Sequence, residues 1–152
     1  MKILMVCLGN ICRSPLAEGI LRSKISDEHI VASAGTISLH EGEHPDRRSV
    51  KTALEYGVDI AHQRANYFTK EHLETFDKIF CMDLKNMEDV LSKASTEEQK
   101  HKVSLILEEA GHFGEDIEVP DPYYGDLEDF ETVYQMLDKA CDTVAEKYGL
   151  IF

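Results

Sequence analysis

Residues 2–15 read KILMVCLGNICRSP and carry the clearest structural signal in the chain. This stretch opens with an apolar run over residues 2–6 that stops before Gly9 and Asn10, as expected of a strand buried on both faces. Ser14 and Pro15 are helix start signals, and the apolar residues after them recur at helical spacing. The stretch therefore predicts a strand, a tight turn and a helix in immediate succession.

The same alternation continues along the chain. Further strands are predicted over residues 30–34, 78–82 and 102–107, and further helices over residues 46–57, 84–91 and 127–147. Right-handed crossovers lay helices on both faces of a parallel sheet, so this order predicts a three-layer α/β sandwich around a four-stranded parallel sheet. A chain of 152 residues suits one domain, residues 1–152, with exposed connections over residues 92–100 and 111–120.

Charge and composition exclude several kinds of partner. The net charge of -13 repels polyanions, so neither nucleic acid nor an anionic membrane surface is expected to bind. An anionic substrate would need a local positive site. No apolar run approaches the roughly 18 residues of a membrane span. The sequence leaves the oligomeric state open.

The cysteines and histidines indicate reduced thiols and no metal. Cys7, Cys12, Cys81 and Cys141 have no C-x-x-C spacing and no secretory signal precedes them, which predicts free thiols in the cytoplasm. The seven histidines lack the spacing of a zinc site, so no metal ligands are expected.

The turn between the first strand and the first helix has the makings of an anion cradle. Successive backbone N–H groups at a helix N-terminus attract anions, and Gly9 and Asn10 tolerate the positive φ angles that a tight curl requires. The residues expected to surround a bound phosphoryl group are Leu8, Gly9, Asn10, Ile11, Cys12 and Ser14.

Cys7 and Arg13 bracket this turn with a Cys-x5-Arg spacing. In a tight loop the spacing returns the guanidinium beside an anion held over the sulfur, where its planar fork can grip two phosphoryl oxygens. The positive surroundings favour the thiolate form of Cys7, which is the nucleophilic form. Taken alone, the pattern is equally compatible with a buried cysteine followed by a surface arginine.

A second chemical motif is VPDPYY, residues 119–124. A phenolate leaving group needs a proton donor, and Asp121 is the candidate general acid. Two prolines stiffen the segment, and Tyr123 and Tyr124 are expected to form a wall for a flat aromatic ring. The alternative to a catalytic role is a structural one, in which Asp121 is an ordinary turn residue between two prolines.

The unbroken segment from Val6 to Pro15 resembles the V-C-x-G-N-I-C-R-S-P signature of the low-molecular-weight protein tyrosine phosphatase family. The DPYY segment is similar to the general-acid loop of that family. Further matches are SAGT at residues 33–36, His62, and Asp83 with Asn86. The resemblance implies a flavodoxin-like fold of the phosphotyrosine phosphatase I type. It also implies metal-independent hydrolysis, without a cofactor, through a cysteinyl phosphate on Cys7. The compact chain without targeting signals suggests a bacterial protein.

The resemblance assigns supporting roles as well. Asn10, Ser14, Ser33 and His62 would brace the loop, with Ser14 touching the Cys7 thiolate, although Ser33 and His62 suit ordinary structural roles equally well. Cys12 would be a resolving thiol for oxidised Cys7, or else a small buried residue that fits the curl. Cys81 and Cys141 are interpreted as structural.

One departure from the family pattern concerns the cleft wall. The family often has a large aromatic residue opposite the paired tyrosines, whereas this chain has Leu39 and His40, which predicts a weaker or differently selective ring clamp. Arg47 and Arg48 are interpreted either as contacts for an anionic peptide or as a solvated face.

Two rival functions stay open at this point. A thiol-dependent arsenate reductase shares the Cys-x5-Arg loop but needs relay cysteines, and a phosphotyrosine-binding module would need neither nucleophile nor acid. The expected partner is a phosphotyrosine-containing protein, with a tyrosine kinase as one candidate.

Overall fold

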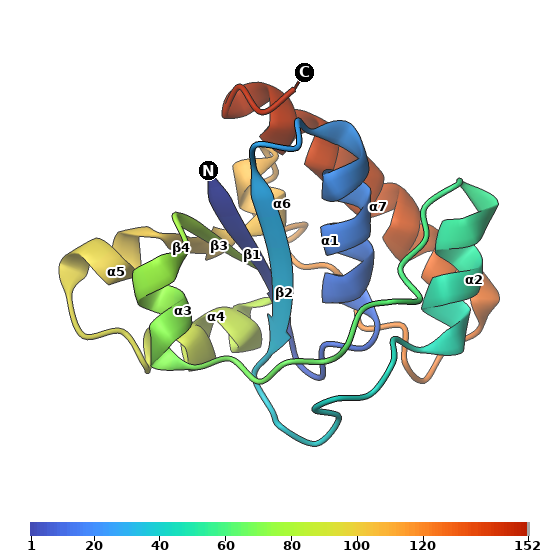
Figure 1. Ribbon diagram of the computed structural model, residues 1–152, viewed down its shortest axis with the longest axis horizontal. Coiled ribbons are helices and arrows are strands. Elements are labelled where there is room, and N and C mark those ends of the chain that lie inside the picture. Colours follow the sequence, from blue (N-terminus) through green and yellow to red (C-terminus); the bar gives the residue numbers. More distant parts are fainter. Residues whose placement is uncertain (152) are drawn as a thin grey trace.

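The structure is a computed structural model and describes residues 1–151. Its core is a sheet of four parallel strands in the order β2-β1-β3-β4 (Figure 1). The strands are β1 (Lys2–Cys7), β2 (Ile30–Gly35), β3 (Lys78–Cys81) and β4 (Val103–Leu105). The predicted four-stranded parallel sheet is confirmed.

Helices cover both faces of the sheet, which completes the predicted three layers (Figure 1). One face is covered by α1 (Arg13–Lys24), α6 (Ile106–Glu109) and α7 (Leu127–Lys147), and α2 (Arg47–Glu55) packs on the outer side of α1 and α7. The opposite face is covered by α3 (Lys70–Thr75) and α4 (Leu84–Leu91), while α5 (Glu97–His101) contacts the edge strand β4.

The central strand β1 separates two hydrophobic clusters. Ile3 and Met5 pack with α1 and α7, whereas Leu4 and Val6 pack with α3 and α4. All four side chains are completely buried. This two-sided burial explains why the strand reads as a continuous apolar run, because side chains of successive residues point to opposite faces of a sheet.

Three short elements differ from the sequence prediction. The strand predicted over residues 102–107 is limited to Val103–Leu105, because the apolar run continues without a break into α6 at Ile106. A buried helix and a buried strand cannot be distinguished by such a run. The sequence pattern did not predict α3, and α5 overlaps the stretch of residues 92–100 that was expected to be an exposed connection. All residues of α5 are at least partly exposed, and the helix has no apolar stripe that could have revealed it.

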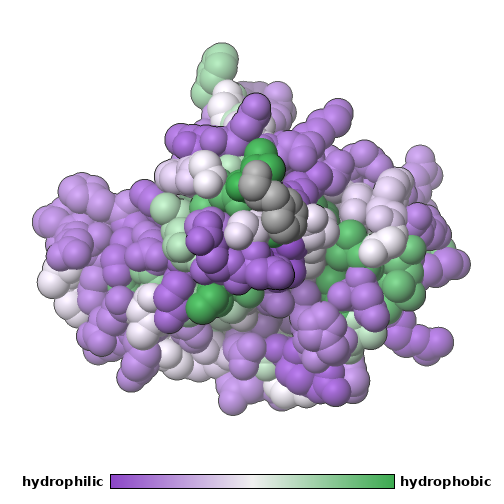
Figure 2. All heavy atoms as spheres, turned by 45° about the horizontal axis from the view of Figure 1, so that its top comes forward, coloured by the Kyte–Doolittle hydropathy of each residue, from purple (hydrophilic) through white to green (hydrophobic). Residues whose placement is uncertain are grey.

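The surface agrees with the charged composition, in which 30% of the residues are Asp, Glu, Lys or Arg. Figure 2 shows that the end of the molecule carrying the chain termini is covered mainly by hydrophilic residues, with hydrophobic ones in small separate patches. Within residues 1–151, none of the helices combines the length and the apolar character that crossing a membrane requires.

The packing of α7 against α1 should contribute strongly to the stability of this layer. Leu137 is completely buried in the cluster that joins α7 to α1 and β1. Leu137→Ala should lower the free energy of unfolding by about 2–5 kcal/mol, because it leaves a cavity. Chemical denaturation measures the loss, and exposed Lys139→Ala in the same helix is the matched control, expected to stay within about 0.5 kcal/mol of wild type. Equal losses in both variants would contradict the packing argument.

Candidate active site

The loop between β1 and α1 curls tightly at the carboxyl edge of the sheet. Asn10 has a φ of 57° and is the only non-glycine residue in the left-handed region among residues 1–151. The loop packs directly against Gly35 at the end of β2: a Cβ there would lie 2.9 Å from the Leu8 oxygen and 3.0 Å from the Asn10 nitrogen. Gly35 is therefore needed so that β2 and the loop can approach each other.

Neighbouring segments hold the loop from outside. The N–H groups of Thr36 and Ile37 donate to the carbonyl oxygens of Cys7 and Leu8 at 3.0 and 3.1 Å, and the Asp46 N–H donates to the Ile11 oxygen at 2.7 Å. These bonds satisfy carbonyl groups of the loop and use none of the loop's own N–H donors. Apart from the Asn10 N–H, which donates to Cys7 Sγ, those donors are left for an anion.

A chain of hydrogen bonds leads from α1 to the sulfur of Cys7. The Asn10 side-chain amide donates to Ser14 Oγ at 2.7 Å and to Ser33 Oγ at 2.9 Å, and Ser33 donates to Glu18 at 2.7 Å. Since Ser14 accepts from Asn10, its own proton is free for Cys7 Sγ, 3.0 Å away. The Asn10 N–H adds a second donor to the sulfur at 3.3 Å.

The direction of these bonds matters for the charge on Cys7. Both Ser14 and the Asn10 N–H can donate to the sulfur, and donors stabilise a thiolate more than a thiol. At the far end of the chain, burial raises the pKa of Glu18, although the hydrogen bond from Ser33 opposes that effect. The network thus presents donors to the position where the sequence predicts the nucleophile.

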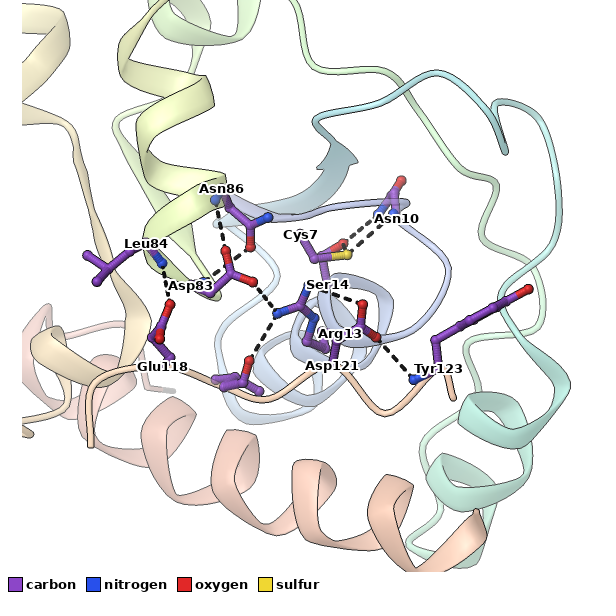
Figure 3. A network of polar contacts seen from close by, with 11 residues as sticks. Cys7, Asn10, Arg13, Ser14, Asp83, Leu84, Asn86, Glu118, Asp121 and Tyr123 are labelled. Carbon is purple, nitrogen blue, oxygen red and sulfur yellow. Dashed lines mark hydrogen bonds and ion pairs between the residues drawn. The ribbon is translucent and has the colours of Figure 1, made fainter. Parts of the chain in front are cut away.

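Arg13 is buried, with 3% of its side chain exposed, and is held from behind (Figure 3). Its Nη1 donates to Asp83 Oδ2 at 2.7 Å and to the Val119 oxygen at 3.0 Å. Burial alone would lower the pKa of Arg13, but the nearby Cys7 and the hydrogen bond to Asp83 outweigh it and raise that pKa. The guanidinium is therefore a fixed positive charge beside the loop.

Asp83 is a functional residue whose role sequence reasoning missed. The sequence shows the Asp83 and Asn86 pair only as part of a family pattern. In the structure Asp83 caps α4 by accepting from the Asn86 N–H at 2.8 Å, while its other oxygen anchors Arg13. The sequence signal for this role would have been a helix-capping motif directly after β3. The carboxyl end of β3 lies beside that of β1, so a capping residue there is close to the loop.

A cavity of about 300 Å³ opens above the loop. Cys7 and Arg13 line it together with Asp121, whose Oδ2 lies 3.7 Å from Arg13 Nη2 and whose Oδ1 accepts from the Tyr123 N–H at 3.1 Å. The other lining residues are Leu8, Gly9, Ile11, Cys12, Ile37, Leu39, His40, Tyr123 and Tyr124. Three distant parts of the sequence thus meet around one hollow.

The predicted binding residues divide into two groups. Asn10 and Ser14 are buried behind the loop and brace it, whereas the other eight line the cavity. Ile37 lines the cavity too and was missed, since an isolated apolar residue after a strand carries no sequence signal. The rings of Tyr123 and Tyr124 meet edge to face with centroids 5.0 Å apart, and Tyr124 is 96% exposed.

Two of the predicted supporting residues differ in their placement. Ser33 lies in the hydrogen-bond chain, but His62 is exposed, and within residues 1–151 its side chain makes no hydrogen bond to the loop. Instead the Asn66 N–H donates to Asn10 Oδ1 at 2.8 Å. That bond comes from a main-chain group, which a search for functional side chains cannot find.

The remaining cysteines have distinct surroundings. All four thiols are free and buried. Cys12 lines the cavity beside Cys7, and burial together with Asp46 raises its pKa, which keeps it a neutral thiol. Cys81 and Cys141 are completely buried, and they belong to the two different core clusters on opposite faces of the sheet.

The structure is an α/β fold in which a thiol, a guanidinium and a carboxylate line the same cavity at the carboxyl edge of the sheet. The comparisons with known proteins agree with this architecture. The family model described as "Low molecular weight phosphotyrosine protein phosphatase" matches residues 2–149. The chain belongs to this family and is a protein-tyrosine phosphatase, a hydrolase.

Relatives resemble the chain over nearly its whole length. The human low molecular weight phosphotyrosine protein phosphatase is 39% identical over 96% of this chain and 94% of its own. A crystal structure of an Entamoeba histolytica protein tyrosine phosphatase with Hepes in its active site has a TM-score of 0.91 and 35% identity, covering 98% and 97% of the two chains. Vibrio vulnificus Wzb in complex with benzylphosphonate has a TM-score of 0.83 and 32% identity, covering 96% and 97%.

The hydrogen bonds of Asn10 predict a strong effect of removing its side chain. Asn10→Ala leaves buried groups unpaired and places a Cβ-bearing residue without compensating bonds at positive φ, so the free energy of unfolding should fall by roughly 2–4 kcal/mol. The Ser14 donor also loses its orientation, and kcat/KM should fall about tenfold or more. Denaturant unfolding and initial rates measure the two effects.

Asn66→Ala is the matched control, because only its backbone N–H contacts Asn10 and the substitution keeps that group. It should leave both quantities close to those of the wild type. An Asn10→Ala variant as stable and as active as Asn66→Ala would contradict the bracing role.

Proposed function

We propose that this protein hydrolyses phosphotyrosine in two displacements at phosphorus through a cysteinyl phosphate. In the first, the Cys7 thiolate attacks phosphorus, and a sulfur–phosphorus bond forms as the bond to the tyrosine oxygen breaks. Arg13 and the loop N–H groups stabilise the equatorial oxygens. Asp121 gives its proton to the departing tyrosine oxygen.

In the second displacement Asp121, now ionised, takes a proton from a water molecule. The water oxygen attacks phosphorus, the sulfur–phosphorus bond breaks, and inorganic phosphate leaves. The Cys7 thiolate is regenerated as the leaving group, stabilised by Ser14 and the Asn10 N–H. Asp121 is protonated again, so each turnover returns the site to its starting state.

One observation carries this proposal: Cys7, Arg13 and Asp121 line the same cavity although 114 positions separate the first from the last, 121 minus 7. Asp121 lies on the rim with 41% of its side chain exposed, whereas Cys7 is 2% exposed at the base. A phosphoryl group above the sulfur would therefore meet the acid on the side of its leaving group, the arrangement that an in-line displacement needs.

The cavity walls suit an aromatic ring above the phosphoryl group. Tyr123, Ile37 and Leu39 supply apolar surface, and Tyr123 and Leu39 are 38% and 74% exposed. Benzylphosphonate, the compound in complex with the Vibrio vulnificus protein, has the same combination of ring and phosphorus. We propose a phosphotyrosine-containing protein as substrate, with a tyrosine kinase as one candidate, in the reducing cytoplasm that four free thiols favour.

The placement of the cysteines favours hydrolysis over arsenate reduction. A reductase must relay a disulfide from the loop to further thiols. Cys81 and Cys141 are each completely buried within a core cluster, on opposite faces of the sheet. Burial also raises the pKa of both thiols, which keeps them unreactive. A pure binding module would have no use for Asp121.

Rates in EDTA test the mechanism. With para-nitrophenyl phosphate and a phosphotyrosine peptide, wild type should turn over, Cys7→Ser should be inactive, and Asp121→Asn should lose roughly 10²- to 10⁴-fold, as expected for a missing general acid. Exposed Asp116→Asn is the matched control and should retain the wild-type rate. Activity in Cys7→Ser, or arsenate turnover in place of ester hydrolysis, would overturn the proposal.

Leu39 offers a test of the ring clamp. Leu39→Phe places an aromatic ring on the wall opposite the paired tyrosines, and a favourable ring contact is worth about 0.5–1.5 kcal/mol. KM for a phosphotyrosine peptide should therefore fall about two- to tenfold, with kcat nearly unchanged. Leu54→Phe, on the outer side of α2, is the control. A KM that falls equally in both variants would refute a specific clamp at position 39.

A further inference from the structure

The segment of residues 118–125 carries Asp121, and we call it the acid loop. Its first part is fixed against β3 and α4 (Figure 3). The Val119 N–H donates to the Met82 oxygen at 2.8 Å, and the Glu118 carboxylate accepts from the Leu84 N–H at 2.8 Å. With the bond from Arg13 to the Val119 oxygen, the chain is well held just before Asp121.

In the second part of the acid loop, one side chain from α2 donates hydrogen bonds to the backbone. Arg48 Nη2 donates to the Tyr123 oxygen at 2.9 Å and Nη1 donates to the Gly125 oxygen at 3.0 Å. Within residues 1–151, no other group outside the acid loop donates a hydrogen bond to the backbone of residues 121–125. The guanidinium also lies over the ring of Tyr123, 5.7 Å from its centroid.

Arg48 is itself held in place. Its Nε and Nη2 donate to the two carboxylate oxygens of Asp46 at 3.0 and 2.9 Å, and its carbon Cζ lies 4.5 Å from the centroid of Phe130. Burial tends to raise the pKa of Asp46, but the bonds from Arg48 outweigh burial and lower it, so the pair stays ionised. A planar fork bound on both edges has little freedom to move.

Asp46 connects this pair to the loop of residues 7–13 between β1 and α1, which we call the phosphate loop. Its backbone N–H donates to the Ile11 oxygen at 2.7 Å, in the middle of the Cys7–Arg13 turn. A continuous path of hydrogen bonds therefore runs from Ile11 through Asp46 and Arg48 to Tyr123. This path joins the phosphate loop to the acid loop. The distance between these loops sets the position of Asp121 relative to a bound phosphoryl group.

We propose that Arg48 is a positioning residue that holds Asp121 at its working distance from the phosphate loop. The inference rests on the proposed role of Asp121 as general acid. Arg48 lies outside the cavity lining and touches neither substrate nor the reacting atoms; it acts through the backbone of Tyr123 and Gly125. Proton transfer is sensitive to geometry, and a misplacement of about 1 Å can cost about a hundredfold in rate.

Its neighbour Arg47 provides a matched control. Arg47 is exposed and within residues 1–151 makes no hydrogen bond or ion pair through its side chain, although it has the same charge and lies in the same helical turn. Arg47→Ala removes one positive charge from the same helical turn and leaves the bonds between α2 and the acid loop intact.

The first test is the dependence of kcat/KM on the leaving group. Arg48→Ala should lower kcat/KM for phenyl phosphate and phosphotyrosine about ten- to a hundredfold, because these leaving groups need a proton. The loss should be several times smaller for dinitrophenyl phosphate, whose leaving group needs none. Arg47→Ala should match wild type on all three. A uniform loss across the esters, or none, would overturn the proposal.

A double-mutant cycle separates this inference from the proposed function. In an Asp121→Asn background, Arg48→Ala should change kcat/KM by less than about twofold, because there is no acid left to position. Full additivity of the two losses would overturn the positioning role while leaving the mechanism intact. If Asp121→Asn alone has no effect, the general-acid assignment itself fails.

Two further measurements exclude simple unfolding. The rate of Cys7 alkylation by iodoacetate in Arg48→Ala should equal that of wild type, since the phosphate loop keeps its other bonds. Arg48→Lys keeps the charge and the stem but lacks the fork, so its leaving-group dependence should also be steeper than that of wild type. Full recovery by lysine, or loss of alkylation in Arg48→Ala, would contradict the proposal.

Discussion

The tight curl between Cys7 and Arg13 is the constraint on which the rest of the site depends. It closes because Asn10 accepts a φ of 57° and because Gly35 presents no side chain to the loop. Both ends of the Asn10 side-chain amide then support the loop. Its oxygen accepts a hydrogen bond from the Asn66 N–H, and its NH₂ group donates to Ser14 and Ser33. These three hydrogen bonds hold Asn10 in a disfavoured backbone conformation. The same conformation orients the donors that face the sulfur of Cys7.

The charges around the loop explain how an acidic protein binds an anion. The chain has a net charge of -13, yet the cavity is lined by a buried arginine. Asp83 neutralises the back of Arg13 and fixes it, leaving the opposite edge of the guanidinium for a ligand. The positive site is thus local and oriented, and the acidic remainder of the surface disfavours polyanions that cannot enter the cavity.

Parallel strands account for the convergence of distant segments. The carboxyl ends of β1, β2 and β3 share one edge of the sheet, so the phosphate loop, Gly35 and Asp83 become neighbours. The acid loop joins them from the far side of β3, through Val119 and Met82. The N-terminal end of α2 links the two loops, because Asp46 binds the phosphate loop and Arg48 binds the acid loop.

Local sequence was sufficient where a pattern had no competing interpretation. The run before Cys7 predicts a buried strand, which the structure confirms. The Cys-x5-Arg spacing and Asp121 point to the proposed chemistry only together with the resemblance to the family, because each pattern alone also fits a structural role. The short helices α3 and α5 lacked a stripe, and residues 102–107 concealed the change from strand to helix. Only the tertiary structure decided that Asp83 anchors Arg13, that His62 is exposed, and that Arg48 rather than Arg47 binds the acid loop. These roles depend on which segments meet at the sheet edge, and contacts between residues 70 or more positions apart leave no periodic trace in a single sequence.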